Sequence, residues 1–357
     1  MRIAVDYQSA AGRKTGIGNV TTNLFAALAR EKHDLEFLFY SSGRDDLNTP
    51  RRIWWESVQV PLKTMRDRPD LVYVPGFAPA IASTARQVVL VHDLIGLAFA
   101  SNQTGAARFY WSRWLPFTLR RAHRLVANSE TTRRDMERFL HVSSSRIRVI
   151  PFAVDNCFRK LTSGDTMRAL LDRLGLGTRP FMIAVGTLEP RKNHKRLIDA
   201  YGLLMSAGDP GFDLAIVGKD AGMQAELFEQ IKGKRLEDRI KLLGFVTNED
   251  LVGLYNASLG FALPSLYEGF GLPALEAMSC GKSGVVSDRS SLPEVVGDAA
   301  ILVDPEDPAA IAEGLKTFAS DAPLRRRLEV SAVLRAKGHT SSAMARAMVE
   351  VFHEAAA

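Results

Sequence analysis

Two glutamates bracket a glycine-rich segment, with seven residues between Glu268 and Glu276. Gly269 and Gly271 allow a tight turn with exposed amides, and Pro273 suits the first turn of a helix because its missing N–H would be unpaired there. Amides at the positive end of a helix hold anions such as a diphosphate. A carboxylate on each side of the turn can accept hydrogen bonds from sugar hydroxyls. The segment therefore predicts a site for a phosphorylated sugar compound, with an ordinary solvated helix start as the alternative.

Two adjacent cations, Arg191 and Lys192, follow a short apolar run at 181–185. A departing diphosphate develops negative charge, so an ammonium or guanidinium held beside it lowers the barrier to its release. This pattern makes Lys192 a candidate catalytic group. Arg191 has a second interpretation, which is an ion pair with Glu189 at the surface.

The elements that must position these residues follow an alternating pattern. Short β-branched runs alternate with longer helical patterns, which is typical of an α/β protein with two doubly wound parallel sheets. The segment 151–177 has a charged, polar middle, so we predict domains at 1–165 and 166–340, with the last helix, 341–357, returning to the first domain. The predicted strands are 3–6, 35–40, 71–74, 88–92, 124–127, 147–150, 181–185, 213–217, 240–243, 260–263, 283–286 and 300–303.

Further candidates follow strands of the first domain, where ligands of open parallel sheets collect. Gly16 and Gly18 form a glycine pair before an apolar helix, but the pair lies too far beyond the strand for a dinucleotide fingerprint. His92 ends a strand and is either structural or part of the site. Asp93 either orients the His92 ring or caps the next turn. Ser129 is foremost a helix cap, with contact to an acceptor as the alternative.

Composition excludes several classes of protein. The net charge of +6 divides unevenly: 24 Lys and Arg against 14 Asp and Glu through Lys160 give +10, and the remaining 22 against 26 give −4. The basic half indicates an anionic partner, but no nucleic-acid-binding motif accompanies it. Cys157 and Cys280 fall in different predicted domains, which disfavours a disulfide scaffold and fits a reducing cytoplasm. Neither a leader peptide nor a metal-ligand cluster is apparent, so we expect a cytoplasmic protein that needs no metal and no cofactor.

The ordered pattern Ser265, Glu268, Gly269, Gly271, Pro273, Glu276 and Gly281 resembles the signature of glycosyltransferase family 4, whose members are retaining enzymes of the GT-B fold. The runs from Gly186 to Asn193, Val217 to Lys219, Leu243 to Val246 and Tyr255 to Ser258 extend the resemblance over most of the second domain. The resemblance implies two Rossmann-like domains that face each other across a cleft, with transfer of a sugar from a nucleotide donor.

The resemblance also implies a role for individual residues. Glu268 corresponds to the family's glutamate beside the donor sugar, Glu276 to the ribose-binding glutamate and Lys192 to the phosphate-binding lysine. The donor-binding set it implies is Gly16, Gly18, Arg191, Lys192, Phe245, Val246, Glu268, Gly269, Phe270, Gly271 and Glu276, and the catalytic set is His92, Lys192 and Glu268. Phe245 and Val246 would lie beside the base and His92 against the donor sugar. Thr187 stands where many members carry an arginine, which weakens the assignment of the donor.

The run from Gly186 to Asn193 resembles that of bacterial polysaccharide mannosyltransferases. The resemblance therefore implies transfer of a hexose, foremost mannose from GDP-mannose, to a lipid-linked or polysaccharide acceptor such as lipopolysaccharide. A UDP-sugar donor, a nucleotide-sugar epimerase and a non-catalytic scaffold or sensor of polysaccharide assembly are the alternatives.

The stretch from Arg108 to Arg124 interleaves aromatic residues with arginines. It fits a helix in contact with an anionic membrane, on its inner face, and fits equally a core helix with arginines that reach outward.

Overall fold

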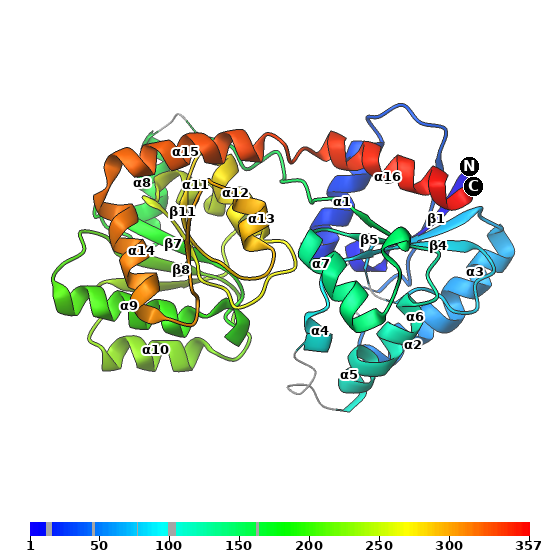
Figure 1. Ribbon diagram of the computed structural model, residues 1–357, viewed down its shortest axis with the longest axis horizontal. Coiled ribbons are helices and arrows are strands. Elements are labelled where there is room, and N and C mark those ends of the chain that lie inside the picture. The colour runs from blue at the N-terminus through cyan, green and yellow to red at the C-terminus, as the bar shows by residue number, and fades with distance from the viewer. Residues whose placement is uncertain (12–15, 45–46, 77, 99–104, 162–163) are drawn as a thin grey trace. The chain divides into compact units, whose positions relative to one another are not determined.

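The computed structural model describes residues 1–11, 16–44, 47–76, 78–98, 105–161 and 164–357. Its contacts divide the chain into two compact units, one formed by 1–153 with 339–357 and the other by 154–338 (Figure 1). The predicted boundary at 165 has to move twelve residues toward the N-terminus. It would otherwise cut helix α8 (Gly164–Arg173), whose hydrophobic face packs on a helix of the second unit.

Unit 1 contains a parallel six-stranded sheet in the order β2-β1-β3-β4-β5-β6. The four inner strands of this sheet are mostly buried, because their β-branched and leucine side chains are covered by helices on both faces, whereas the two edge strands are partly exposed. Strand bounds are β1 (Arg2–Asp6), β2 (Glu36–Tyr40), β3 (Leu71–Val74), β4 (Arg86–Val91), β5 (Arg124–Ala127) and β6 (Ile147–Val149). Helix bounds are α1 (Gly16–Leu28), α2 (Thr49–Trp54), α3 (Val60–Asp67), α4 (Ile95–Ala98), α5 (Gly105–Phe109), α6 (Leu115–Leu119), α7 (Glu130–Asp135) and α16 (Ser341–Ala356).

The C-terminal helix α16 belongs to unit 1, where it packs on α1, β3 and β4. Phe352 of this helix is fully buried, and its ring centroid lies 5.2 Å from that of Tyr73. At the helix end, the Arg86 guanidinium donates to the carbonyls of Ala355 and Ala356 at 3.0 and 2.8 Å. These contacts satisfy carbonyls that a helix end leaves without intrahelical donors.

Unit 2 contains a second parallel six-stranded sheet, in the order β12-β11-β10-β7-β8-β9. In Figure 1 helices α9, α10 and α14 lie on one side of it, and α8, α11 and α12 on the other. Strand bounds are β7 (Phe181–Val185), β8 (Asp213–Val217), β9 (Ile240–Gly244), β10 (Gly260–Leu263), β11 (Gly284–Ser287) and β12 (Ile301–Val303). The remaining helices are α9 (His194–Ala207), α10 (Gln224–Gly233), α11 (Asn248–Ala257), α12 (Leu272–Ser279), α13 (Leu292–Val296), α14 (Pro308–Ser320) and α15 (Ala322–Ala336).

Each sheet has a point where the strand order reverses. In unit 2 the chain runs outward from β7 through β8 to β9, and then returns to place β10 on the other side of β7. The connections that leave β7 and β10 therefore run to opposite sides, and in open parallel sheets the carboxyl ends of strands at such a reversal point are where ligands bind. All twelve strands correspond to predicted ones within two residues, and the expected α/β architecture with two doubly wound parallel sheets is confirmed.

Candidate active site

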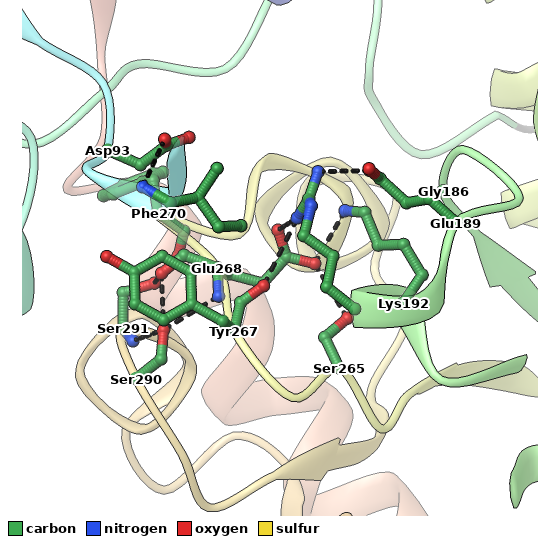
Figure 2. A network of polar contacts seen from close by, with 12 residues as sticks. Asp93, Gly186, Glu189, Lys192, Ser265, Tyr267, Glu268, Phe270, Ser290 and Ser291 are labelled. Atoms are coloured by element: carbon green, nitrogen blue, oxygen red, sulfur yellow. Dashed lines mark hydrogen bonds and ion pairs between the residues drawn. The ribbon is translucent and has the colours of Figure 1, made fainter. Parts of the chain in front are cut away.

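The loops at the carboxyl ends of β7 and β10 contain the two motifs that the sequence singled out. Lys192 lies in a short 3-10 turn (Pro190–Lys192) after β7, and Glu268 lies in the loop after β10. Sequence separates these residues by 76 positions, yet the Lys192 Nζ lies 2.6 Å from Glu268 Oε1 (Figure 2). The parallel topology brings them together because the two strands are neighbours.

Glu268 is a buried carboxylate with three side-chain donors. Besides Lys192, the Arg191 Nη1 lies 2.9 Å from Oε2, and the Ser265 hydroxyl donates to Oε1 at 2.8 Å. Burial works to raise the pKa of this carboxyl, but the charges of Lys192 and Arg191 and their hydrogen bonds lower it below its ordinary value. Glu268 is therefore ionised at neutral pH and joins the two loops through charge-assisted hydrogen bonds.

The cations are part of an ion-pair cluster. Arg191 pairs with Glu189 at 2.7 Å, as the alternative interpretation predicted, and with Glu268 as well. Only 8% of the Lys192 side chain is exposed. Its ammonium has three N–H donors and Glu268 accepts one of them. Glu268 thus fixes the direction in which the Lys192 ammonium points.

Two small backbone features place Lys192. A Cβ at Gly186 would lie 2.9 Å from the Lys192 Cδ, so the lysine stem needs the bare glycine surface to pass over it. Asn193 adopts the left-handed conformation with φ 61°, and its Nδ2 donates to the carbonyls of Pro264 and Pro305 at 2.9 and 2.7 Å. Asparagine is one of the residues that tolerate this conformation. Its side chain ties the loops after β7, β10 and β12 together.

The glycine-rich turn runs into a helix as predicted. α12 begins at Leu272, with Pro273 in its first turn and Glu276 about one turn inside. Gly271 has φ 106°, which disfavours any other residue. A Cβ there would also lie 2.7 Å from the Leu292 Cδ2.

Two serines hold the backbone of this turn. The Ser291 hydroxyl lies 2.9 Å from the Glu268 carbonyl and 2.8 Å from the Phe270 carbonyl. The Glu268 amide donates to the Ser290 hydroxyl at 2.8 Å, so this amide is not one of the exposed donors that the sequence predicted for the turn. The Phe270 side chain is 5% exposed and is part of the core.

Glu276 is partly exposed, and its Oε2 lies 3.3 Å from the Tyr255 hydroxyl. Desolvation raises the pKa of Glu276 to about 7, although the Tyr255 hydrogen bond and the Lys192 charge work in the opposite direction. The carboxyl therefore changes its charge near neutral pH.

The other residues of unit 2 that the resemblance predicted to bind the sugar donor lie further along the sheet. Phe245 and Val246 follow the edge strand β9, two strands away from β7. The Phe245 side chain is 80% exposed, and Gly244 before it has φ 67°. An exposed ring at a strand's carboxyl end is available to stack on a flat ligand.

His92 follows β4 in unit 1 and is held in one tautomer. Its Nε2 lies 2.7 Å from the Pro75 carbonyl, which can only accept, so Nε2 carries the proton. Burial lowers the pKa of His92 to about 4, although the Pro75 contact works against this. The ring is therefore neutral at physiological pH, and its Nδ1 is an acceptor. Its backbone carbonyl accepts from Asn128 Nδ2 at 2.7 Å.

A cavity of about 210 Å³ lies in unit 1 beside His92. Asp93 and Ile17 also line it, together with apolar residues of β4, α6 and the π-helical turn Tyr110–Trp114. The Asp93 carboxylate accepts from the Ile95 amide at 3.1 Å, which is the capping role predicted as one alternative. Ser129 likewise caps α7 by accepting from the Thr132 amide at 3.0 Å.

Gly16 and Gly18 lie in the first turn of α1, not in a loop that precedes the helix. A Cβ at Gly18 would lie 2.7 Å from the Ser9 carbonyl, so this glycine permits a close approach to the turn after β1. The space around Gly16 is open to at least 4 Å. Their contact with a donor stays a prediction.

The two cysteines need a correction. Cys157 and Cys280 both belong to unit 2, because the unit boundary precedes residue 157. Both are free thiols, and burial raises the pKa of each to about 12. The prediction that they lie in separate domains is therefore wrong.

Sequence reasoning missed several polar residues of the site. His194 begins α9 with Nε2 3.4 Å from the Gly186 carbonyl, while burial lowers its pKa to about 4. Ser290 and Ser291 were missed because a serine pair after a strand is common, and only the fold brings them to Glu268. Asn193 had a usable signal, since an asparagine between a turn and a helix is typical of a left-handed residue.

Across the described parts of the chain, His, Cys, Asp and Glu side chains form no cluster of three or more that could hold a metal ion. The helices of the same described residues include none that is long and apolar enough to cross a membrane.

Comparison with known proteins identifies the class of protein to which this fold belongs. A family model described as Glycosyltransferase Family 4 matches residues 14–156, and one described as Glycosyl transferases group 1 matches residues 170–333. Sucrose-phosphate synthase from Thermosynechococcus elongatus has a similar structure, with a TM-score of 0.77 over 99% of this chain and 98% of that one, at 19% identity. The chain therefore has the GT-B fold of glycosyltransferases.

Curated relatives narrow the class. The chain is 32% identical over 262 residues to O-antigen chain mannosyltransferase B of Escherichia coli, which covers 73% of this chain and 66% of that protein. It is 30% identical over 301 residues to the serotype-specific mannosyltransferase WbdA of Escherichia coli, across 80% of this chain and 37% of the relative. The chain thus spans about two thirds of the length of the first relative and little more than one third of the length of the second. This chain belongs to glycosyltransferase family 4.

Proposed function

We propose that this chain is a retaining hexosyltransferase that moves mannose from GDP-mannose to a lipid-linked or polysaccharide acceptor. The observation that carries the proposal is the buried cluster in which Lys192 and Arg191 hold Glu268 at the reversal point of the second sheet. Mannose is favoured because both relatives described above are named mannosyltransferases.

In this proposal the two cations face the donor's diphosphate while Glu268 accepts from a hydroxyl of the sugar. Because Glu268 occupies one donor of Lys192, the ammonium keeps a fixed direction and needs little reorganisation when the leaving group becomes charged. The turn Gly269 to Gly271 lies at the diphosphate end, where backbone and helix dipole favour an anion.

The remaining predicted residues bind other parts of the donor. Glu276 accepts from the ribose hydroxyls, and Phe245 with Val246 lies against the base. In unit 1, the glycines Gly16 and Gly18 of α1 are proposed to contact the diphosphate of the donor. The Nδ1 of His92 accepts a hydrogen bond from a sugar hydroxyl, since its Nε2 already donates to the Pro75 carbonyl.

The proposed reaction needs no enzymic nucleophile, metal or cofactor. The bond between sugar C1 and the diphosphate oxygen breaks, and an acceptor hydroxyl oxygen bonds to C1 on the same face. The departing diphosphate oxygen takes the proton of that hydroxyl. Lys192 and Arg191 stabilise the negative charge that the leaving group gains.

Calorimetric titration of the protein with GDP-mannose, UDP-glucose, GDP, UDP and ADP in the presence of a chelator tests the proposal. Tighter binding of GDP and GDP-mannose, followed by transfer to an added acceptor, is the expected result. A preference for UDP compounds would replace the donor with a UDP-sugar. Product formed without acceptor would indicate an epimerase, and binding of none of these compounds would favour a scaffold.

We also propose peripheral contact of unit 1 with an anionic membrane, from the cytoplasmic side. Phe109, Arg113 and Phe117 are exposed and recur every four residues along the helical segment that runs from α5 to α6. Arg121 is exposed in the turn after α6, and its guanidinium lies 3.6 Å from the Phe117 ring centroid. Aromatic rings that insert and arginines that meet headgroups are typical of interfacial helices.

Sedimentation with vesicles tests this contact. The protein is expected to pellet with phosphatidylglycerol vesicles and to remain in solution with phosphatidylcholine vesicles. Phe117→Ser should reduce the pelleted fraction, whereas Phe228→Ser, which changes a similarly exposed ring on α10 of unit 2, should leave it unchanged. Equal sedimentation with both lipids would contradict the proposal.

A further inference from the structure

Tyr255 of α11 lies directly against Glu276. Its side chain is fully buried, and its hydroxyl lies 3.3 Å from Glu276 Oε2 and 3.2 Å from the Pro273 carbonyl. The other side of the ring meets Phe158, with centroids 6.1 Å apart. Tyr255 is thus fixed by packing, while its hydroxyl reaches the carboxyl that the proposed function assigns to the ribose.

We propose that Tyr255 is a positioning residue for Glu276, and that binding of a nucleotide sugar is coupled to release of a proton from Glu276. This inference rests on the proposed function and assigns a mode of regulation to the same site. It concerns a residue that contacts no substrate and acts only through the carboxyl of Glu276.

The geometry gives the hydroxyl two arrangements. A phenol has one proton, and here it faces two acceptors at nearly equal distance. When Glu276 is ionised, Tyr255 can donate to its carboxylate. When Glu276 is protonated, the carboxyl can donate to the phenol oxygen while Tyr255 donates to Pro273. The first arrangement includes a charge-assisted hydrogen bond, which is the stronger kind, so Tyr255 favours the ionised form.

The surroundings of Glu276 place its titration near neutral pH. Desolvation is the largest influence and raises its pKa to about 7, with Asp155 adding to the increase, while Tyr255 and Lys192 lower it. Cys157 and Cys280 also face this carboxyl, but each thiol has a pKa raised to about 12 and stays neutral. Burial likewise raises the pKa of Tyr255, so Glu276 is the group that changes charge.

Ribose binding selects one of the two charge states. Two adjacent hydroxyls donate best to a carboxylate, which offers two acceptor oxygens, whereas a protonated carboxyl competes with its own O–H. Binding therefore favours ionised Glu276 and expels the proton from the fraction that carries one. Affinity should increase with pH until Glu276 is fully ionised.

The first test uses the unmodified protein and the nucleotide sugar that binds it most tightly. A nucleotide sugar is a better probe than a free diphosphate, because its phosphates do not titrate between pH 6 and 8. The dissociation constant should fall about tenfold across this range, as the ionised fraction of a group with a pKa of about 7 changes. Calorimetry at pH 7 in buffers of different ionisation enthalpy should show release of about half a proton per ligand.

Three variants test which residues couple nucleotide-sugar binding to proton release. Tyr255→Phe should move the affinity profile to higher pH, so that binding is severalfold weaker at pH 7 and similar to the unmodified protein at pH 9. Glu276→Gln should bind weakly with a flat profile. Tyr201→Phe is the matched control, because that hydroxyl is equally buried in unit 2 and donates to the Phe212 carbonyl at 2.6 Å.

The outcomes separate this inference from the proposed function. A protein that binds no nucleotide sugar contradicts the proposed function itself. A protein that binds one with a flat pH profile and without proton release overturns the inference while the function stands. If Tyr255→Phe changes the dissociation constant by the same factor at every pH, the role of Tyr255 is overturned. The same holds if Tyr201→Phe shifts the affinity profile as much as Tyr255→Phe does. The proton-release measurement does not depend on the folding of any variant.

Discussion

Lys192 and Glu268 are the residues whose energetic and chemical roles are most closely joined. Lys192→Met leaves an ionised, buried carboxylate with one cationic partner fewer, and should lower the unfolding free energy by up to about 3 kcal/mol, because Arg191 still pairs with Glu268. The double variant Lys192→Met/Glu268→Gln removes both charges and should recover most of that stability. Turnover should nevertheless stay about 10²- to 10³-fold low in both variants, because the leaving group has lost its ammonium.

Urea unfolding and initial transfer rates measure the two roles separately. Lys195→Met is the control, since its pair with Glu226 has both side chains about half exposed, and it should alter neither quantity appreciably. A double variant that regains both stability and turnover would show that Lys192 serves only to neutralise Glu268.

At the scale of elements, Gly271 connects the loop after β10 to α12. Gly271→Ala should lower the unfolding free energy of unit 2 by about 1–3 kcal/mol and weaken donor binding, because φ is 106° and the added Cβ meets Leu292. Gly177→Ala is a suitable control, with at least 4 Å of open space around its Cβ position. Calorimetric affinity and thermal unfolding check the prediction, and wild-type behaviour of Gly271→Ala would contradict it.

Sequence predicted these elements more accurately than it predicted their contacts. Parallel strands that are buried on both faces leave continuous apolar runs, so strands such as 71–74 and 181–185 were placed without error. The turn into α12 was predictable because Gly271 and Pro273 have narrow conformational roles. The glycines at 16 and 18, which one residue separates, have broad conformational roles, and only tertiary packing shows that they belong to α1.

Contacts between distant segments had no local signal. The pair of Lys192 and Glu268 depends on β7 and β10 being neighbours, which follows from the strand order and not from either motif. The boundary at 165 was misplaced for a related reason. A polar amphipathic helix such as α8 resembles a linker in composition until its packing partner in the second unit is known.

At the scale of the whole molecule, the two units have different polar interiors. Unit 1 buries two neighbouring carboxyls, Asp6 and Glu56. The Tyr110 hydroxyl donates to Glu56 Oε1 at 3.0 Å, and Trp55 donates to Asp6 at 2.9 Å. Glu56 Oε2 is buried and finds no hydrogen-bond partner among the residues that the structure describes. Burial raises the pKa of Asp6 to about 6 and that of Glu56 well above its ordinary value.

These shifts predict a pH dependence of stability that is specific to unit 1. Between pH 4 and at least pH 6 the unfolded chain loses these protons while the folded unit retains them, so the stability of unit 1 falls as pH rises. Glu56→Gln keeps an acceptor for Tyr110 without the charge. It should raise the unfolding free energy of unit 1 at pH 8 by ~1 kcal/mol and make that free energy depend less steeply on pH. Glu350→Gln, a change at a side chain that is 64% exposed, should do neither.

The chain supplies its own probe for this measurement. All four tryptophans, Trp54, Trp55, Trp111 and Trp114, lie in unit 1, so tryptophan fluorescence during urea unfolding follows unit 1, while circular dichroism follows both units. Two units need not unfold together, and separate transitions must be analysed separately. The fluorescence transition of the unmodified protein should shift to lower urea from pH 5 to pH 8, and Glu56→Gln should lessen that shift. A shift of equal size in Glu56→Gln would show that Glu56 is ionised in the folded unit already at pH 5.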